Sequence, residues 1–430
     1  MCGILCVIQN ESCTCNLDDL RQKIERDLKN RGPDVQNSVT IEDNSSFRIY
    51  FHATLLWLRG AQPFIQPVQR DGNVLLWNGD LYDTELPDGI SDTELLTQQL
   101  SCGETHFDIR KVLSQIKGPG SYIFYNERLK TLWFGRDVLG RHSLLATIEK
   151  CHTIIASIGF SGSNLVEVPS NGIYEIALDR NLFKLYPWSH KASKSPFMPF
   201  EIQTEDVPAS IEKVAVEPAG EIFCDVDEFL RSPVGENAIE GLRKVLMLAV
   251  EERVGAQPLL CKECIWNEVS KTGGAFTSTA IKLSAGVCHQ SKVAVLFSGG
   301  IDSVVLAYLA GQCLKPGEPL DLINVAFEQA DGSFDVPDRI TAHQAYEELK
   351  TLLPDRLFNL VLVNVTKSQL REMREARIKN LLYPLETVLD DSIGCAIWFA
   401  ARGQGQLWNR DNIDYCSPAR VILLGMVRKR

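Results

Sequence analysis

Short apolar runs separated by turn-forming residues dominate the first part of the chain, from residue 2 to about residue 185. Two segments, 17–30 and 91–100, instead space their apolar residues near 3.6, and the second begins with a Ser or Asp cap. Many strands with two early helices predict a layered α+β fold. The strand-like runs, bounded by Gly, Asn, Asp and Pro, are 3–8, 47–58, 73–79, 121–126, 131–137, 153–157 and 172–178.

The pattern changes after residue 188. Residues 189–234 mix Pro, Ser and acidic residues and read as a linker, and 255–290 is irregular and reads as an insertion. Strands alternating with helices predict a parallel sheet with right-handed crossovers in the last part of the chain. We therefore expect domains at 2–188 and 235–430. The predicted elements of the second domain are helices at 236–254, 302–314 and 338–353 and strands at 292–297, 321–328 and 358–365.

Length and composition agree with two or three globular domains in the 430 residues. The net charge of −11 argues against a broad nucleic-acid surface, which needs clustered Lys and Arg. No run approaches the ~20 apolar residues of a membrane helix, and the apolar start has no basic region typical of a signal peptide. We expect a cytoplasmic protein without a membrane partner, and the sequence leaves its oligomeric state open.

The 13 cysteines follow no regular disulfide framework, so we expect reduced thiols. Cys261 and Cys264 form a CxxC pair, and Cys13 and Cys15 form a CxC pair. Zinc needs two further ligands, and no second pair stands at a useful spacing from the CxxC. The sequence therefore predicts ordinary thiols at both places.

The most specific motif is Ser298-Gly299-Gly300-Ile301-Asp302-Ser303, between a predicted strand and a predicted helix. Adjacent glycines let the backbone turn tightly and direct its N–H groups inward, and the helix N-terminus adds a positive dipole. This suits a phosphate. A Walker lysine and a GxGxxG fingerprint are both missing. The alternative interpretation is a plain Gly-Gly turn, capped by Asp302, that binds no ligand.

Five motifs occur in a familiar order: MCGI, RGPD, WNGDLYD, SDTE and FSGGIDS. With them the chain resembles the glutamine-dependent asparagine synthetases over nearly its whole length. That resemblance implies an αββα N-terminal-nucleophile sandwich, a class II glutamine amidotransferase, at 2–188. It also implies an α/β ATP-pyrophosphatase domain, adenine nucleotide α-hydrolase-like, at 235–430.

In such enzymes the residue corresponding to Cys2 becomes the first residue after removal of Met1. Its free amine then serves as the base for its own thiol, which attacks the side-chain amide of glutamine. The resemblance gives Asn78 and Gly79 the role of oxyanion donors. It places Asp80 and Asp92 at the glutamine site, Asp92 on the α-amine. Taken alone, Asn-Gly is also a common hairpin turn, and Asp92 a common helix cap.

The chain departs from the family pattern at one binding residue. Thr54 stands where the family carries the arginine that pairs with the glutamine carboxylate. Arg59 is a candidate replacement, but it is odd-spaced from Thr54, so a regular strand would direct it to the other face. Asn30 stands where a histidine is common, before an intact Arg31-Gly32-Pro33-Asp34.

For the second domain the resemblance implies ATP and Mg²⁺ as cofactors and aspartate as the residue that is adenylated. It assigns the pyrophosphate to Ser298, Gly299, Gly300, Asp302 and Ser303, the metal to Asp302, and the adenine and ribose to the surroundings of Phe297 and Phe327. Glu386 is a candidate site acid. The competing reading is a surface glutamate with Leu385 packed inward.

The family's acidic loop would follow Gly425, where this sequence reads Met426-Val427-Arg428-Lys429-Arg430. We expect a truncated or alternatively spliced second domain that has lost aspartate adenylation. The alternative to a glutamine-hydrolysing enzyme is a catalytically inactive relative with a binding or regulatory role. A third reading, a tRNA-thiolating ligase, would need reactive Cys pairs and a basic RNA-binding face.

Overall fold

A computed structural model of the chain describes residues 2–10, 13–43, 47–59, 63–82, 90–188, 201–202, 225–255, 261, 263–264, 288–408 and 413–425. The chain divides into two compact units. The first contains residues 1–213 and 379–386, and the second contains residues 214–378 and 387–430. Each unit is described by itself.

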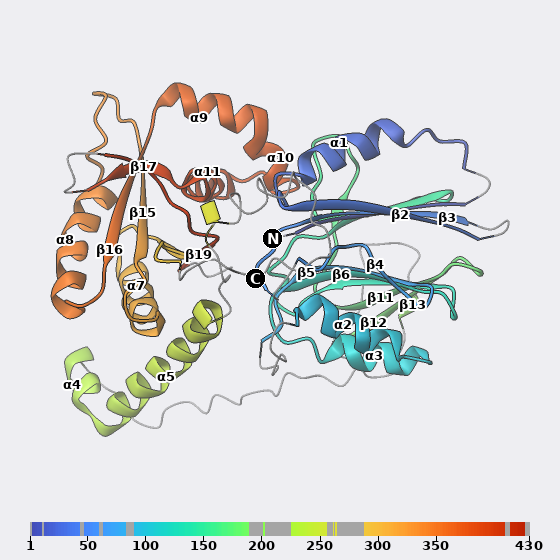
Figure 1. Ribbon diagram of the computed structural model, residues 1–430, viewed down its shortest axis with the longest axis horizontal. Coiled ribbons are helices and arrows are strands. Elements are labelled where there is room, and N and C mark those ends of the chain that lie inside the picture. The colour runs from blue at the N-terminus through green and yellow to red at the C-terminus, as the bar shows by residue number, and fades with distance from the viewer. Residues whose placement is uncertain are drawn as a thin grey trace. The chain divides into compact units, whose positions relative to one another are not determined.

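The first unit is built on two sheets (Figure 1). One has the strand order β10-β8-β9-β1-β3-β2, and the other has the order β13-β12-β11-β7-β6-β5-β4. The strands are β1 (Gly3–Asn10), β2 (Val35–Asp43), β3 (Phe47–Leu55), β4 (Val68–Arg70), β5 (Asn73–Gly79), β6 (Gly120–Asn126), β7 (Thr131–Arg136), β8 (Leu145–Ile148), β9 (His152–Ala156), β10 (Val166–Glu167), β11 (Gly172–Ala177), β12 (Leu182–Pro187) and β13 (Glu201–Ile202).

Alternation along the strands divides the core of this unit into layers. Ile4 and Cys6 of β1 face the core between the sheets, whereas Leu5 and Val7 face α1 (Asp18–Leu28). On the outer side of the second sheet, Trp77 packs with residues of α2 (Asp92–Ser101) and α3 (His106–Ser114). The result is helix, sheet, sheet, helix, the order that the family resemblance implies.

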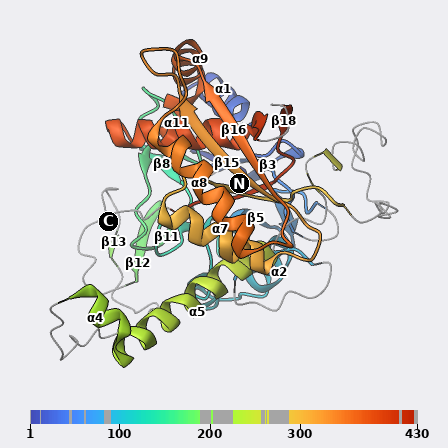
Figure 2. The same cartoon turned by 90° about the vertical axis from the view of Figure 1, so that its left-hand side faces the viewer.

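The second unit contains a mixed sheet of order β18-β17-β16-β15-β14-β19. Its four strands β19, β14, β15 and β16 are parallel. The strands are β14 (Val293–Leu296), β15 (Leu320–Phe327), β16 (Phe358–Val365), β17 (Gln404–Leu407), β18 (Asp414–Cys416) and β19 (Val421–Leu423). Helices α7 (Ile301–Cys313) and α8 (Pro337–Leu352), which connect β14, β15 and β16, lie side by side in Figure 2.

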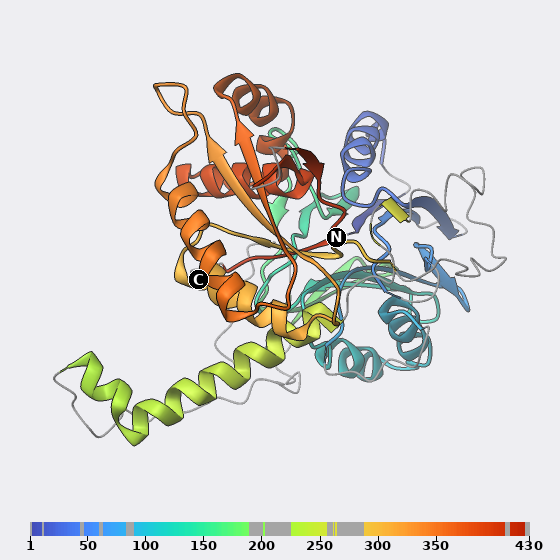
Figure 3. The ribbon, with the colours of Figure 1, turned by 60° about the vertical axis from the view of Figure 1, so that its left-hand side comes forward.

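Further helical segments occur among the described residues after 225. They are α4 (Val226–Arg231), α5 (Pro233–Gly255), α9 (Lys367–Met373), a π-helical turn (Arg374–Ile378) followed by α10 (Lys379–Leu382), and α11 (Val388–Arg402). Helix α5 packs against α7 through its carboxyl-terminal part, while its first half projects away with α4 (Figure 3). Val250 and Val254 are buried there, whereas Leu242 and Val245 are exposed.

The predicted strands and helices are confirmed, but the structure contains further elements. Helix α3, the strands β2, β4, β8, β10 and β12, and the elements between β16 and β19 have no counterpart in the predicted pattern, and α4 forms inside 189–234, which was interpreted as a linker. Most of that linker, most of the 255–290 insertion and the five residues after Gly425 lie outside the described residues. None of the helices in the described ranges is long and apolar enough to cross a membrane.

Candidate active site

Cys2 immediately precedes β1 and is held beside the end of β3. Gly3 pairs with Thr54 in the β1–β3 ladder, which sets Cys2 next to Leu56. The Leu56 N–H points at the Cys2 sulfur, with 3.5 Å between N and Sγ. Burial raises the pKa of the Cys2 thiol, so the thiolate needs a nearby base or positive charge to form.

The RGPD segment positions the residues that follow β3. A side chain on Gly32 would meet the backbone carbon of Thr54 at 2.1 Å, so only glycine fits. The carboxylate of Asp34 accepts a 2.7 Å hydrogen bond from the Trp57 N–H. Arg31 is held by the carbonyl of Ser157, and burial lowers its pKa to about 10. The motif therefore holds the segment beside Cys2 in place.

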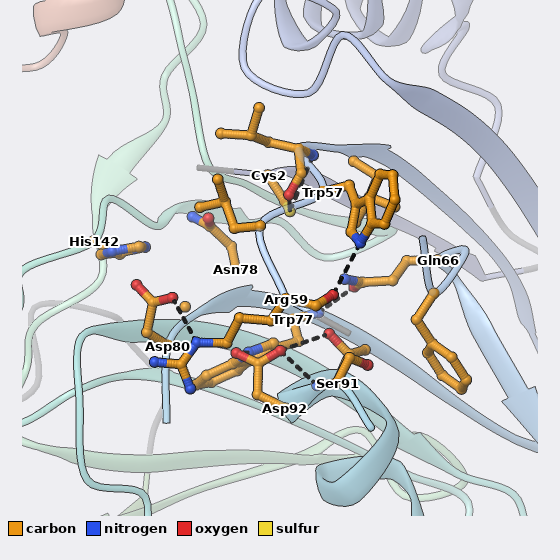
Figure 4. A pocket seen from close by; sticks show the side chains of 16 residues that line it. Cys2, Trp57, Arg59, Gln66, Trp77, Asn78, Asp80, Ser91, Asp92 and His142 are labelled. Atoms are coloured by element: carbon orange, nitrogen blue, oxygen red, sulfur yellow. Dashed lines mark hydrogen bonds and ion pairs between the residues drawn. The ribbon is translucent and has the colours of Figure 1, made fainter. Parts of the chain in front are cut away.

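These segments enclose a pocket that lies wholly in the first unit (Figure 4). It brings together Cys2, Asn78, Gly79, Asp80, Asp92 and Arg59, the six residues that the sequence predicted for one glutamine site. The remaining lining residues are Leu55, Leu56, Trp57, Leu58, Phe64, Gln66, Trp77, Ser91, Thr93 and His142.

Asn78 and Gly79 end β5 at the floor of this pocket. A side chain on Gly79 would meet the Pro119 carbonyl oxygen at 2.4 Å, which explains the glycine. The Asn78 amide is fully buried, and its nitrogen donates a long 3.4 Å hydrogen bond to Ser121. Its other amide atom has no partner. Because amide oxygen and nitrogen are interchangeable in shape, a rotation of the amide gives a free N–H donor.

Asp92 is a buried carboxylate at the start of α2. It accepts hydrogen bonds from the Trp77 indole at 3.2 Å and from the Thr93 N–H at 2.8 Å. Burial, and then the charge of Asp80, raises its pKa to about 6. The helix cap itself is Ser91, whose side chain accepts from the Glu94 N–H. The alternative interpretation of Asp92 as the cap is therefore wrong.

Arg59 reaches the pocket because β3 ends at Leu55, so strand alternation does not extend to residue 59. Its guanidinium donates to the Leu81 carbonyl at 2.8 Å and lies 3.7 Å from the Asp80 carboxylate. Thr54 is absent from the pocket lining. Its hydroxyl is buried and donates to the Leu28 carbonyl at 2.8 Å. The expectation that Arg59 points away is corrected: it is the cation of this pocket.

Sequence reasoning missed His142 and Gln66, which stand outside every motif. Burial lowers the pKa of His142 to about 3, so it is neutral near pH 7. Gln66 accepts a 2.6 Å hydrogen bond from the Trp77 N–H and is itself buried. Both reach the pocket through tertiary folding, and no spacing in the sequence indicates this.

The second candidate site is the loop after β14. Gly299 has φ +80°, and a side chain there would meet the Thr341 backbone carbon at 2.3 Å. The loop is fixed by a hydrogen bond from Ser303 to the Gly300 carbonyl at 2.8 Å and by one from Thr341 to the Ser298 carbonyl at 2.9 Å. It leads directly into α7, as the motif predicted.

Sheet topology places this loop where α/β proteins bind ligands. From β14 the chain winds through β15 to β16 on one side, while β19 lies on the other side. The carboxyl end of β14 is therefore a topological switch point. Asp302 is exposed there, and Gly425 after β19 lies close enough that a side chain on it would meet the Asp302 Cβ at 3.2 Å.

The structure also places Phe297 and Phe327, which were predicted around the nucleotide, and the candidate site acid Glu386. The Phe297 side chain is in the core at 1% exposure, so only its backbone borders the loop. Phe327 ends β15 and packs edge-on against Phe399 with 6.2 Å between ring centroids. Glu386 is exposed in a segment that groups with the first unit, and Leu385 is exposed rather than packed inward.

The pKa of Asp92 predicts a pH-dependent affinity for a ligand with an ammonium group. The carboxylate must be ionised to accept that group, so affinity falls as pH falls through about 6. At pH 5 we expect about tenfold weaker binding of glutamine than at pH 7. Equilibrium binding to Cys2→Ala avoids any pH effect of the reaction. An analogue of glutamine that lacks the α-amino group should show no such dependence, and an equal dependence for both ligands would contradict the role of Asp92.

Comparison with known proteins matches residues 286–402 to the asparagine synthase family. Asparagine synthetase domain-containing protein CG17486 of Drosophila melanogaster is 35% identical, covering 99% of this chain and 76% of that protein. Asparagine synthetase domain-containing protein 1 of Homo sapiens is 31% identical, covering 99% and 77%. A solved glutamine phosphoribosylpyrophosphate amidotransferase from B. subtilis covers 96% of this chain and 99% of its own, with 13% identity. The TM-score is 0.35.

Proposed function

Because the chain belongs to the asparagine synthetase domain-containing proteins, we propose that residues 2–188 are a glutamine amidotransferase that releases ammonia from glutamine at Cys2. The observation that carries this proposal is the pocket. It joins Cys2 to a buried carboxylate, an arginine and a buried amide with an unpartnered atom. A nucleophile, two charged anchors of opposite sign and an oxyanion donor are the groups needed to bind an amino acid and cleave its side-chain amide.

The charged anchors match the two ends of an amino acid. Asp92 accepts hydrogen bonds from the substrate ammonium group, and Arg59 pairs with its carboxylate. Asp80 lies beside Arg59, and its negative charge also acts on Asp92. With both ends held, the side-chain amide of glutamine extends toward Cys2.

Removal of Met1 leaves Cys2 with a free α-amine, which takes the proton of its own thiol. The buried thiol needs this base, because His142 with a pKa of about 3 is too weak a base near pH 7. The thiolate attacks the amide carbon. The oxyanion is stabilised by the Asn78 amide and the Gly79 N–H, and the ammonium group of Cys2 returns the proton to the departing ammonia. Water then cleaves the thioester and releases glutamate.

The second unit is proposed to bind ATP at the loop of residues 298–303, as an ATP-pyrophosphatase domain over 235–430. Backbone N–H groups of the loop and of the start of α7 would hold the phosphates. The exposed carboxylate of Asp302 is the oxygen ligand that Mg²⁺ prefers, and the ion would supply charge neutralisation for the phosphates.

The test is release of glutamate and ammonia by the purified chain incubated with glutamine alone. We expect both products in equal amounts. Asparagine, one methylene shorter, should not be cleaved, because its amide would not reach the sulfur when both ends are anchored. A purified, folded chain that binds glutamine and releases no glutamate would overturn the proposal in favour of a catalytically inactive relative.

A further inference from the structure

Four ligand-type side chains meet near the end of β1 that is remote from Cys2. They are Cys13, Cys15, Cys151 and His152, and their sulfur and nitrogen atoms all lie within 4.8 Å of one another. The first two follow β1, Cys151 lies in the turn between β8 and β9, and His152 begins β9. The CxC pair alone predicted ordinary thiols, because a zinc site needs further ligands that its local sequence does not show.

The backbone holds both segments in register. Gln9 of β1 pairs with His152 of β9. The Asn10 N–H donates to the Cys151 carbonyl at 3.1 Å, and the Cys13 N–H donates to the Asn10 carbonyl at 3.0 Å. The four side chains therefore converge from positions fixed by the sheet and its adjoining turn.

The spacings match tetrahedral zinc. Zn–S bonds of about 2.3 Å at a tetrahedral centre place two sulfurs about 3.8 Å apart, and Cys15 Sγ and Cys151 Sγ are 3.8 Å apart. A Zn–N bond of about 2.0–2.1 Å implies a sulfur-to-nitrogen spacing of about 3.6 Å, and Cys151 Sγ is 3.6 Å from His152 Nδ1. A disulfide would need about 2.05 Å between sulfurs.

We propose that Cys13, Cys15, Cys151 and His152 bind a Zn²⁺ ion that fastens the segment after β1 to the β8–β9 turn. Three thiolates and an imidazole in tetrahedral arrangement are a zinc-type ligand set. Four protein ligands leave no open position, so the ion is structural. The eight residues of β1, about 26 Å long, separate it from Cys2.

The test must distinguish this cluster from a second group of cysteines. Cys261, Cys264 and Cys288 of the second unit also place their sulfurs within 4.8 Å, and within the described residues no fourth ligand joins them. Metal bound there would add to the zinc content measured for the whole chain. The experiment therefore compares variants of one cluster with the same parent chain.

The full-length chain is purified under reducing conditions, and its zinc content is measured by inductively coupled plasma mass spectrometry. Cys151→Ser and His152→Ala should each carry one zinc ion less per chain than the parent. Cys102→Ser, which removes an exposed thiol of the same unit outside the cluster, should carry as much as the parent. Equal zinc in the parent and in Cys151→Ser would overturn the proposal.

Cobalt substitution needs no destabilised variant and identifies the ligands. In a Cys264→Ser chain, which disables the other cluster, Co²⁺ should give the visible absorption of tetrahedral thiolate coordination. Adding His152→Cys should keep the metal and strengthen the sulfur-to-cobalt charge-transfer band, since a fourth thiolate replaces the imidazole. Absence of the tetrahedral spectrum, or a freshly purified chain without zinc and lighter by two hydrogens through a Cys15–Cys151 disulfide, would overturn it.

Discussion

Cys2→Ala loses glutamine hydrolysis altogether while it keeps the fold and binds glutamine. The sulfur is the nucleophile that attacks the amide in the proposed reaction, so no thioester forms without it. Asp92 and Arg59 remain in place to hold the substrate. The measurement is glutamate release under saturating glutamine, with binding followed by calorimetry on the same preparation.

Cys102→Ala is the matched control for this variant, because Cys102 is an exposed thiol at the end of α2 in the same unit. It should hydrolyse glutamine at the rate of the parent. Cys2→Ala that retains parental activity would show that another group attacks the amide, and the account of the pocket would then be wrong.

Gly299→Ala strongly weakens ATP binding to the second unit. The alanine would bring a Cβ within 2.3 Å of the Thr341 backbone carbon, and it would keep a left-handed φ of +80°. The left-handed conformation alone costs about 1–2 kcal/mol. The close approach to a backbone atom cannot be relieved by a side-chain rotation, so the loop must move. We expect ATP affinity to fall by more than about 100-fold, or about 2.7 kcal/mol.

Gly317→Ala is the control that separates these two effects. Gly317 has φ +79°, nearly the same as Gly299, but a Cβ there meets no atom within 4 Å. It should show the strain as a modest loss of stability and bind ATP like the parent. ATP binding is measured by calorimetry at a temperature where both variants are folded. Parental ATP affinity in Gly299→Ala would contradict the phosphate-binding role of the loop.

Apolar runs bounded by turn residues were sufficient for the central strands of both units. The buried strands around Leu5 and Trp77 are continuous apolar runs, and the strand–loop–helix at Gly299 carries a distinctive local signal. Helix α3 was missed because it is too short for a clear amphipathic repeat, although its Thr105–Asp108 capping box is a local signal of a helix start. Local patterns thus predicted the elements that owe their form to local chemistry.

The residues that the sequence misplaced depend on where a strand ends and on contacts between distant segments. Arg59 enters the pocket only because β3 stops at Leu55, and alternation gives no sign of that stop. His142 lies 140 positions after Cys2 in the sequence, yet both residues line the same pocket. Cys15 and Cys151 are separated by 136 residues, so the cluster they form with Cys13 and His152 has no local spacing that a motif could capture.

The central claim is that Cys2 becomes an amino-terminal nucleophile for a glutamine amide. Its most direct measurement is the mass of the amino-terminal peptide after the purified chain reacts with a diazoketone analogue of glutamine. The account predicts a peptide that begins at Cys2 and carries one adduct on its sulfur, with the adduct prevented by excess glutamine. A peptide that retains Met1 or an acetyl group, or a Cys2 left unmodified, would contradict it.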